Sequence, residues 1–164
     1  MEDKLDGGPQ VPLWLLEPNE YQWVDEATGL SCELMRSELT YTWCGYVKLP
    51  PDHDWYGRGI QHLDVQVHGG LTYGGPRHEE NEWWIGFDCA HAFDYRPGED
   101  MMWEKMRATA DPQMLQLLDN MNAAKATLPV WLRENYRTLD YAKQETTELA
   151  QQVHAHVPGI PSFG

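Results

Sequence analysis

Hydrophobic and polar positions follow two different periods along the chain. Residues 62–68 alternate strictly: Leu63, Val65 and Val67 fall on one face and polar residues on the other, a pattern typical of a half-buried strand. After residue 111, apolar residues instead recur at steps of three and four, which is the spacing along one side of a helix. Strands first and helices after predict an α+β fold.

The first half of the chain contains further segments with strand character. The predicted strands are residues 21–25 and 31–37, paired as a hairpin about the turn at 27–29, then residues 41–47, 62–68 and 83–89. Residues 51–61 and 74–81 hold Gly, Pro and charged residues and are predicted to be loops. These segments predict a small antiparallel or mixed β-sheet as the core.

The second half is predicted to be helical. Asp111 followed by Pro112 is a good N-cap and first helical residue. From residue 130 to residue 154 the apolar residues keep helical spacing, which predicts a long amphipathic last helix packed on the sheet or on a partner. The domain organisation expected from these patterns is an irregular segment over 1–20, a single α+β domain over 21–157 and a C-terminal tail over 158–164.

Composition excludes several classes of partner. The formal net charge is −14, so a phosphate backbone or an anionic membrane surface would be repelled, and neither direct nucleic-acid binding nor membrane binding is expected. There is no apolar run of about 18 residues, and the acidic N-terminus has no secretory character. Three cysteines without a CxxC pair suit a reducing compartment, so a cytoplasmic location is expected. The excess negative charge either keeps the protein soluble or docks on a basic partner protein.

The candidate chemistry is concentrated between residues 64 and 94, where titratable groups flank a Gly-Gly pair. The candidate catalytic residues are His68, Asp88, His91 and Asp94. His91 is suited to act as a general base oriented by Asp88. Cys89 is either a nucleophile activated by a neighbouring histidine or, as is more common after an aromatic strand, a small buried hydrophobe.

Ligand contacts are expected from the turn and from nearby cationic and aromatic side chains. Gly69 and Gly70 either let backbone N–H groups approach a ligand or form a tight turn. The His-Gly-Gly run also occurs in esterase oxyanion holes, but no GxSxG nucleophile accompanies it, which disfavours an esterase. Arg77 is a candidate for binding phosphate, and Trp83 and Trp84 are candidates for base stacking.

A metal site is a further hypothesis. Histidine, aspartate and cysteine are all competent ligands for zinc. The candidate metal ligands are Asp64, His68, Asp88 and His91, which could share an ion only if the two segments that carry them are neighbours. The single residue between Cys89 and His91 is not a zinc-finger spacing. The cofactor is therefore unknown, with a divalent metal as the candidate.

Three blocks of the sequence resemble an uncharacterised family of small proteins from phages and actinobacteria. The blocks are WCGYV at residues 43–47, DVQVHGGLTY at 64–73 and WWIGFDCAH at 83–91, and the helix that contains Tyr141 and Glu145 through Ala150 resembles the family's last helix. The resemblance covers about residues 43–152. It implies a phage-like origin and a clustered site, but it supplies no activity.

These observations predict a phage-encoded protein of the host cytoplasm that binds a small anionic, nucleotide-like ligand. If it is an enzyme, a hydrolase directed against host immune signalling is expected. One alternative is an acidic inhibitor that mimics nucleic acid and occupies the basic groove of a host defence factor. Another is a virion or assembly protein whose long C-terminal helix makes homo-oligomer contacts. The first hypothesis requires His68 and His91 to share one environment.

Overall fold

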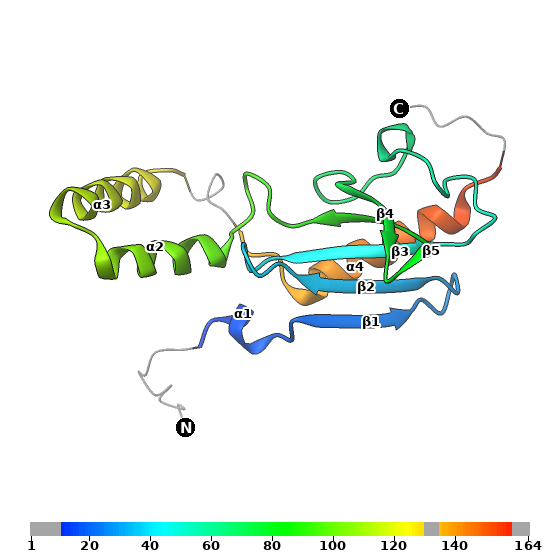
Figure 1. Cartoon of the computed structure of the whole chain (residues 1–164), viewed down its shortest axis with the longest axis horizontal. Helices are drawn as coiled ribbons and strands as arrows, with labels where there is room; N and C mark the ends of the chain where they lie inside the picture. Colours follow the sequence, from blue (N-terminus) through cyan, green and yellow to red (C-terminus); the bar gives the residue numbers. More distant parts are fainter. Residues whose placement is uncertain (1–10, 130–134, 159–164) are drawn as a thin grey trace, which may run out of the picture.

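A computed structural model of the chain describes residues 11–129 and 135–158 (Figure 1). Within these residues the centre is a five-stranded sheet in the order β1-β2-β3-β5-β4, and every neighbouring pair is antiparallel. The strands are β1 Glu20–Val24, β2 Ser31–Arg36, β3 Trp43–Leu49, β4 Tyr73–Arg77 and β5 Glu79–Asp88. The helices are α1 Leu13–Leu16, α2 Pro97–Thr109, α3 Pro112–Ala126 and α4 Leu139–Ala155, and a 3₁₀ turn covers Ile60–His62. The predicted α+β class, with a long last helix, is confirmed.

Helix α4 packs along one face of the sheet, against β2 and β3. Its buried residues are Ala142, Thr146, Leu149, Ala150 and Val153. The four apolar ones join the strand residues Leu34, Val47 and Phe87 in one hydrophobic core. Gly45 of β3 permits the close approach of the helix, because a Cβ atom there would lie only 2.4 Å from the hydroxyl of Thr146. Among the described residues, no helix covers the opposite face, which we call the open face.

Several predicted elements are confirmed. β1 and β2 pair as the expected hairpin, and β3 and the second half of β5 lie where strands were predicted. α3 begins after Asp111, whose carboxylate accepts a hydrogen bond from the backbone N–H of Met114 at 2.8 Å. The N-cap chemistry read from the sequence therefore operates in the fold.

The prediction of a sheet strand over residues 62–68 is wrong. The segment is extended, and its apolar residues are half-buried against the core while the polar residues up to Gln66 are exposed. Its backbone does not join a ladder. Instead, the N–H and the C=O of Gln66 both bond to the side-chain amide of Gln152 on α4, each at 2.7 Å. The alternation in sequence therefore reflects alternate burial, and a glutamine side chain takes the place of a neighbouring strand.

Residues 74–81, predicted to be a loop, instead form most of β4 and the start of β5. Pro76 is tolerated because β4 is an edge strand of the sheet. The ladder shifts register between Pro76 and Arg77, and His78 turns the chain with a left-handed φ of 66°. Gly and Pro residues, which led to the prediction of a loop, here belong to a hairpin with a β-bulge.

The helices and the N-terminal segment also differ from expectation. α2 was not predicted. α4 begins at Leu139, where Thr138 caps it by accepting a hydrogen bond from the N–H of Tyr141 at 3.1 Å. The predicted start at residue 130 is thus too early for residues 135–138, and residues 130–134 lie outside the described ranges. The segment predicted to be irregular over 1–20 contains α1, and its first ten residues are likewise not described.

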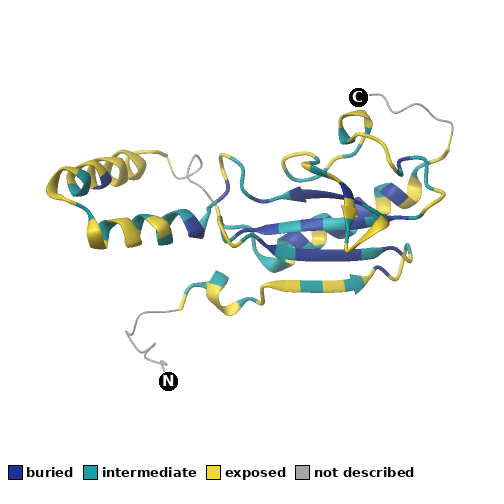
Figure 2. Ribbon diagram, viewed as in Figure 1, coloured by how far each residue is buried: buried dark blue, intermediate teal, exposed yellow. Residues whose placement is uncertain are grey.

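The helices α2 and α3 form a hairpin, which we call the helical arm, that projects from one end of the sheet (Figure 1). Most of its residues are exposed, in contrast to the strands (Figure 2). Across the two described ranges, no helix combines the length and the apolar character that a membrane crossing requires.

Candidate functional site

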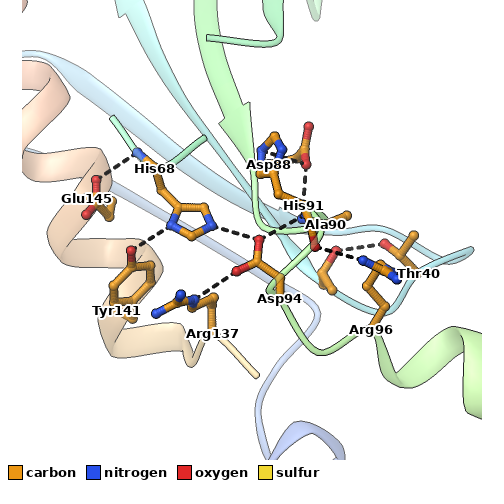
Figure 3. A network of polar contacts seen from close by, with 11 residues as sticks. Thr40, His68, Asp88, Ala90, His91, Asp94, Arg96, Arg137, Tyr141 and Glu145 are labelled. Carbon is orange, nitrogen blue, oxygen red and sulfur yellow. Dashed lines mark hydrogen bonds and ion pairs between the residues drawn. The ribbon is translucent and has the colours of Figure 1, made fainter. Parts of the chain in front are cut away.

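The imidazole of His68 and the carboxylate of Asp94 form the centre of a polar network at one end of the sheet (Figure 3). His68 Nε2 lies 2.7 Å from Asp94 Oδ2, and His68 Nδ1 lies 2.7 Å from the hydroxyl of Tyr141. An ionised carboxylate can only accept hydrogen bonds, so the proton of this contact belongs to Nε2. In the neutral imidazole, Nδ1 then accepts the O–H of Tyr141. Hydroxyl, imidazole and carboxylate stand in one chain of hydrogen bonds.

Asp94 is almost fully buried, with 1% of its side chain exposed. Its Oδ1 accepts from Nε of Arg137 at 2.9 Å, and its Oδ2 also accepts from the backbone N–H of His91 at 3.0 Å. Burial raises the pKa of this carboxyl, but the hydrogen bonds from Arg137 and His68 outweigh burial and hold the pKa below its ordinary value of 3.8. The buried carboxylate is therefore charged at neutral pH.

A backbone link between distant segments brings Arg137 to Asp94. The loop after β5 exchanges two hydrogen bonds with Asn135: Asn135 N–H donates to Phe93 O at 2.9 Å, and Tyr95 N–H donates to Asn135 O at 2.5 Å. Asp94 and Asn135 form an isolated parallel bridge. Asn135 is thus held beside the loop that contains Asp94, just before α4 begins, and Arg137 follows two residues later.

The first turns of α4 hold the other side of the network. Glu145, one turn after Tyr141, accepts from the backbone N–H of His68 at 3.1 Å. Burial raises the pKa of Tyr141, and the negative charge of Glu145 raises it further, so the hydroxyl stays protonated at neutral pH. The guanidinium of Arg137 lies 4.9 Å from the centre of the Tyr141 ring. Its two terminal nitrogens make no hydrogen bond to any described residue, and its side chain is 29% exposed.

His91 stands beside His68, with 5.6 Å between the ring centres. Its Nε2 is buried and lies 3.4 Å from Oδ1 of Asp88, which brings the expected pair together as a close contact without a hydrogen bond. Gly69 lies directly against the His91 ring: a Cβ atom at this glycine would be 2.0 Å from Nε2. The side chains of His91 and Asp88 are each about a third exposed, but the Nε2 atom of His91 is buried, so the exposed part of the imidazole is the rest of the ring. Asp88 accepts from the N–H of Ala90 at 3.0 Å and so fixes the turn.

The structure thus brings together most of the residues singled out in the central segment of the sequence. The residues that converge are His68, Gly69, Asp88, His91 and Asp94. Gly70 takes part only in the turn, with a φ of 81° and no atom within 4 Å of where a Cβ would stand. Asp64 is exposed on the extended segment.

Three predicted ligand contacts lie elsewhere, which corrects that part of the sequence interpretation. Trp84 stands four residues before Asp88 on β5, or about 14 Å along a strand. It lines a groove of about 590 Å³ on the open face together with Glu33. Arg77 donates to Glu33 at 2.9 Å and stacks on the ring of Tyr46 at 3.6 Å from its centre. The indole of Trp83 packs beside Tyr56 and the core, with 5.9 Å between ring centres.

The arrangement gives the metal hypothesis no support. Within the described ranges, no group of three or more His, Cys, Asp or Glu side chains is placed to hold a metal ion. Both ring nitrogens of His68 are already engaged in hydrogen bonds.

Cys89 is fully buried in the core. Burial and, after it, the charge of Asp94 raise the pKa of its thiol well above the ordinary value. The structure therefore favours the small buried hydrophobe over the nucleophile.

Sequence reasoning missed Arg137, Tyr141 and Glu145 as members of the network. Tyr141 and Glu145 are four residues apart in a helical segment, the spacing of neighbours on one helix face. Arg137 comes directly before Thr138, a residue type that commonly caps a helix. These signals place the three residues at the start of a helix. They do not reveal which loop that helix end meets.

Comparisons with protein-family models, with curated proteins and with solved structures find no match. The resemblance to a phage and actinobacterial family therefore stays a prediction from the sequence, and the geometry of the site carries the functional argument.

Proposed function

We propose that the network around His68 is a catalytic centre that binds a small anionic ligand and hydrolyses it. The observation that carries this proposal is the linear arrangement of the Tyr141 hydroxyl, the His68 imidazole and the buried Asp94 carboxylate. In this arrangement Asp94 fixes the tautomer of His68, and Nδ1 of His68 in turn holds the hydroxyl of Tyr141 in one position, as a proton donor requires. A histidine held on both nitrogens also has a fixed ring and a fixed tautomer, as acid–base chemistry requires.

Arg137 is the proposed anchor for the anion, in place of Arg77. Its Nε is held by Asp94, which orients the guanidinium, and its terminal nitrogens are available beside the Tyr141 ring. Such a fork matches the oxygens of a phosphate or carboxylate group. In a chain of net charge −14, a cation fixed in this way supplies the local attraction that an anionic ligand needs.

The proposed reaction uses His91 and Tyr141 on either side of His68. His91, with its buried Nε2 beside Asp88, takes a proton on Nδ1 from a water molecule as the water oxygen bonds to the electrophilic atom of the ligand. The bond to the leaving oxygen breaks, and Tyr141 turns its O–H from Nδ1 of His68 to that oxygen and donates the proton to it. Tyr141 then regains a proton from solvent, and His91 releases the one it took. Burial and the charge of Glu145 raise the pKa of Tyr141, so its proton is present at rest and available to be donated.

The ligand class that we propose is nucleotide-like. The family resemblance supports a phage-encoded protein acting in the cytoplasm of its host. A phage hydrolase for a small anionic nucleotide would act against host immune signalling. This step rests on the resemblance and on the anionic ligand inferred from Arg137.

The test begins with native mass spectrometry of the purified chain, which should reveal a retained anion. Hydrolysis is then followed with bis(p-nitrophenyl) phosphate, ATP and a cyclic dinucleotide as probes. Tyr141→Phe is expected to lower kcat by about 10²–10⁴, the usual contribution of a general acid. Arg137→Gln is expected to raise KM more than it lowers kcat.

Two substitutions serve as matched controls. Tyr73→Phe removes a hydroxyl that bonds only to the carbonyl of Pro76, and Arg58→Gln removes a cation from an exposed pair with Asp54. Both should retain full activity. The proposal is overturned if none of the probes is bound or cleaved. It is equally overturned if cleavage survives both Tyr141→Phe and Arg137→Gln.

A further inference from the structure

The helical arm exposes an apolar strip that its own fold leaves uncovered. Within α3 the one buried residue is Leu118, and in α2 burial is confined to Pro97 and Gly98 at the base. Four large apolar side chains remain between 37% and 52% exposed: Met102, Met106, Leu117 and Met121. Helices of 13 and 15 residues with so little burial have little tertiary support. We call these four side chains the arm strip.

All four side chains lie on the same side of the arm. At 3.6 residues per turn, Met102 and Met106 are one turn apart on α2, and Leu117 and Met121 are one turn apart on α3. The ion pair between Arg107 and Asp119, at 2.9 Å, fixes how the two antiparallel helices are rotated. Arg107 and Asp119 mark one side of the hairpin. At about 100° of rotation per residue, Met102 and Met106 on α2 and Leu117 and Met121 on α3 point to the opposite side.

Three carboxylates of the arm are engaged in contacts of their own. Asp119 is paired with Arg107, and Glu99 is paired with Arg96 at 2.7 Å. Asp111 is used as the N-cap of α3. The other residues that flank the strip by helical spacing are uncharged or cationic: Gln113, Asn120 and Ala124, with Lys125 four residues after Met121 and Lys105 three residues after Met102. In a chain of net charge −14, the strip is thus a surface where a similar molecule can approach without bringing carboxylates together.

We propose that the arm strip is the contact of a homodimer, with the strip of a second copy of this chain as its occupant. Two helical hairpins related by a two-fold axis form a four-helix bundle, which closes the apolar faces on each other. The arm projects from the end of the sheet, so that two acidic bodies joined arm to arm stay apart (Figures 1 and 2). Methionine side chains are flexible and fit such a self-complementary interface well. The contact is separate from the His68 network and independent of its function.

This contact differs from the one expected from the sequence, which was the long C-terminal helix. The residues of α4 that point away from the sheet are polar, among them Asp140, Gln144, Glu148 and Gln151. Its apolar residues are buried in the core. The arm offers the apolar surface that α4 does not.

Analytical ultracentrifugation of the full chain tests the proposal. We expect a monomer–dimer equilibrium with a micromolar Kd, because the strip is smaller than a standard interface. Salt should tighten the dimer, since screening weakens the repulsion between two acidic copies. Met106→Glu and Leu117→Glu should each weaken it at least about tenfold, because each places an unpaired carboxylate in the contact.

Ala108→Glu is the matched control, as it adds the same charge at an exposed position of α2 away from the strip. It should leave the dimer intact, and circular dichroism should show all three variants folded. A chain that is monomeric at millimolar concentration overturns the proposal and leaves the strip to a different partner. A dimer that survives both strip substitutions overturns it as well.

Discussion

Two buried carboxylates of this protein are each bonded to one histidine and one arginine. The two trios are Asp94 with His68 and Arg137, and Glu33 with His78 and Arg77. Their exposed fractions are 1% for Asp94 and 3% for Glu33, and the carboxylate–histidine distance is 2.7 Å in both. The chemical groups are thus the same. What differs is the remainder of each environment.

The histidines are where the two trios diverge. His68 is 12% exposed and has Tyr141 on its second nitrogen, whereas His78 is 49% exposed and bonds, among the described residues, to Glu33 alone. Arg77 and His78 are also neighbours in sequence and tie one hairpin tip to β2. The Asp94 trio joins three segments that only the complete fold brings together. The two trios thus share a carboxylate, a histidine and an arginine, and the hydroxyl on the imidazole is present only in the Asp94 trio among the residues that the structure describes.

Removing the charge of each carboxylate should produce the largest difference in stability between the two trios. Asp94→Asn is expected to lower the free energy of unfolding by about 3–5 kcal/mol, because Arg137 loses its counter-charge and one acceptor oxygen of the buried side chain becomes an NH₂ donor. Glu33→Gln should cost about 1–3 kcal/mol. Here Arg77 keeps its stacking on Tyr46, at 3.6 Å, and the half-exposed His78 can be hydrated. Urea unfolding of the two variants measures both values. Equal losses would mean that the extra partners of the Asp94 trio do not contribute to stability.

A second comparison uses the left-handed residue that each cluster contains. Gly69 has a φ of 67° beside His91, and His78 has a φ of 66° in its own cluster. A side chain is tolerated at 78 because that turn is open to solvent. At residue 69 the His91 ring occupies the space.

Gly69→Ala should therefore destabilise the protein more than Gly70→Ala. Both glycines have a positive φ, so alanine costs each about 1–2 kcal/mol. At Gly69 the new Cβ would also lie 2.0 Å from His91 Nε2, which adds about 1–3 kcal/mol of overpacking. Gly70 has open space around its missing side chain and is the control. Thermal and urea unfolding measure the difference, and equal effects would show that the Gly69–His91 contact is not tight in solution.

The sequence predicts contacts within the central segment better than contacts between that segment and α4. The convergence of His68 and Asp94 was expected, because both flank strand-like segments joined by Gly-rich turns. Arg77 was assigned to the same site because it lies nearby in sequence. The direction of β5 separates them, since its two ends are far apart. Closeness in sequence therefore suggested that Arg77 lies at the site, but the length of β5 places it far from Asp94.

The partners from α4 were beyond the reach of sequence patterns. The helical spacing after residue 130 predicted a longer helix, but Thr138 caps it at Leu139, which leaves Arg137 in extended chain. Likewise, the alternation over 62–68 correctly gave the buried side of that segment. It could not show that Gln152 would satisfy the backbone in place of a strand. Hydrophobic period reports burial, whereas the partner of a polar group depends on tertiary packing.

The smallest expected effect concerns the ionisation of Asp94, which should make the stability of the protein depend on pH. Burial acts to raise the pKa of this carboxyl, but Arg137 and His68 together hold it below its ordinary value of 3.8. A carboxyl with a lowered pKa in the folded state stabilises the fold at any pH above its unfolded pKa. That stabilisation is lost as pH falls through the folded pKa, because protonation then removes the ion pair.

The free energy of unfolding of the native chain should therefore exceed that of Asp94→Asn by a constant amount from neutral pH down to the ordinary carboxyl pKa. Below that point the two curves should converge. Urea unfolding over a series of buffers from neutral to acid measures both. Convergence that begins well above the ordinary pKa would mean that burial outweighs the hydrogen bonds and that the pKa is raised. In that case Asp94 would not be a fixed charge for His68, and the feature that distinguishes this trio from the Glu33 cluster would be the Tyr141 hydroxyl alone.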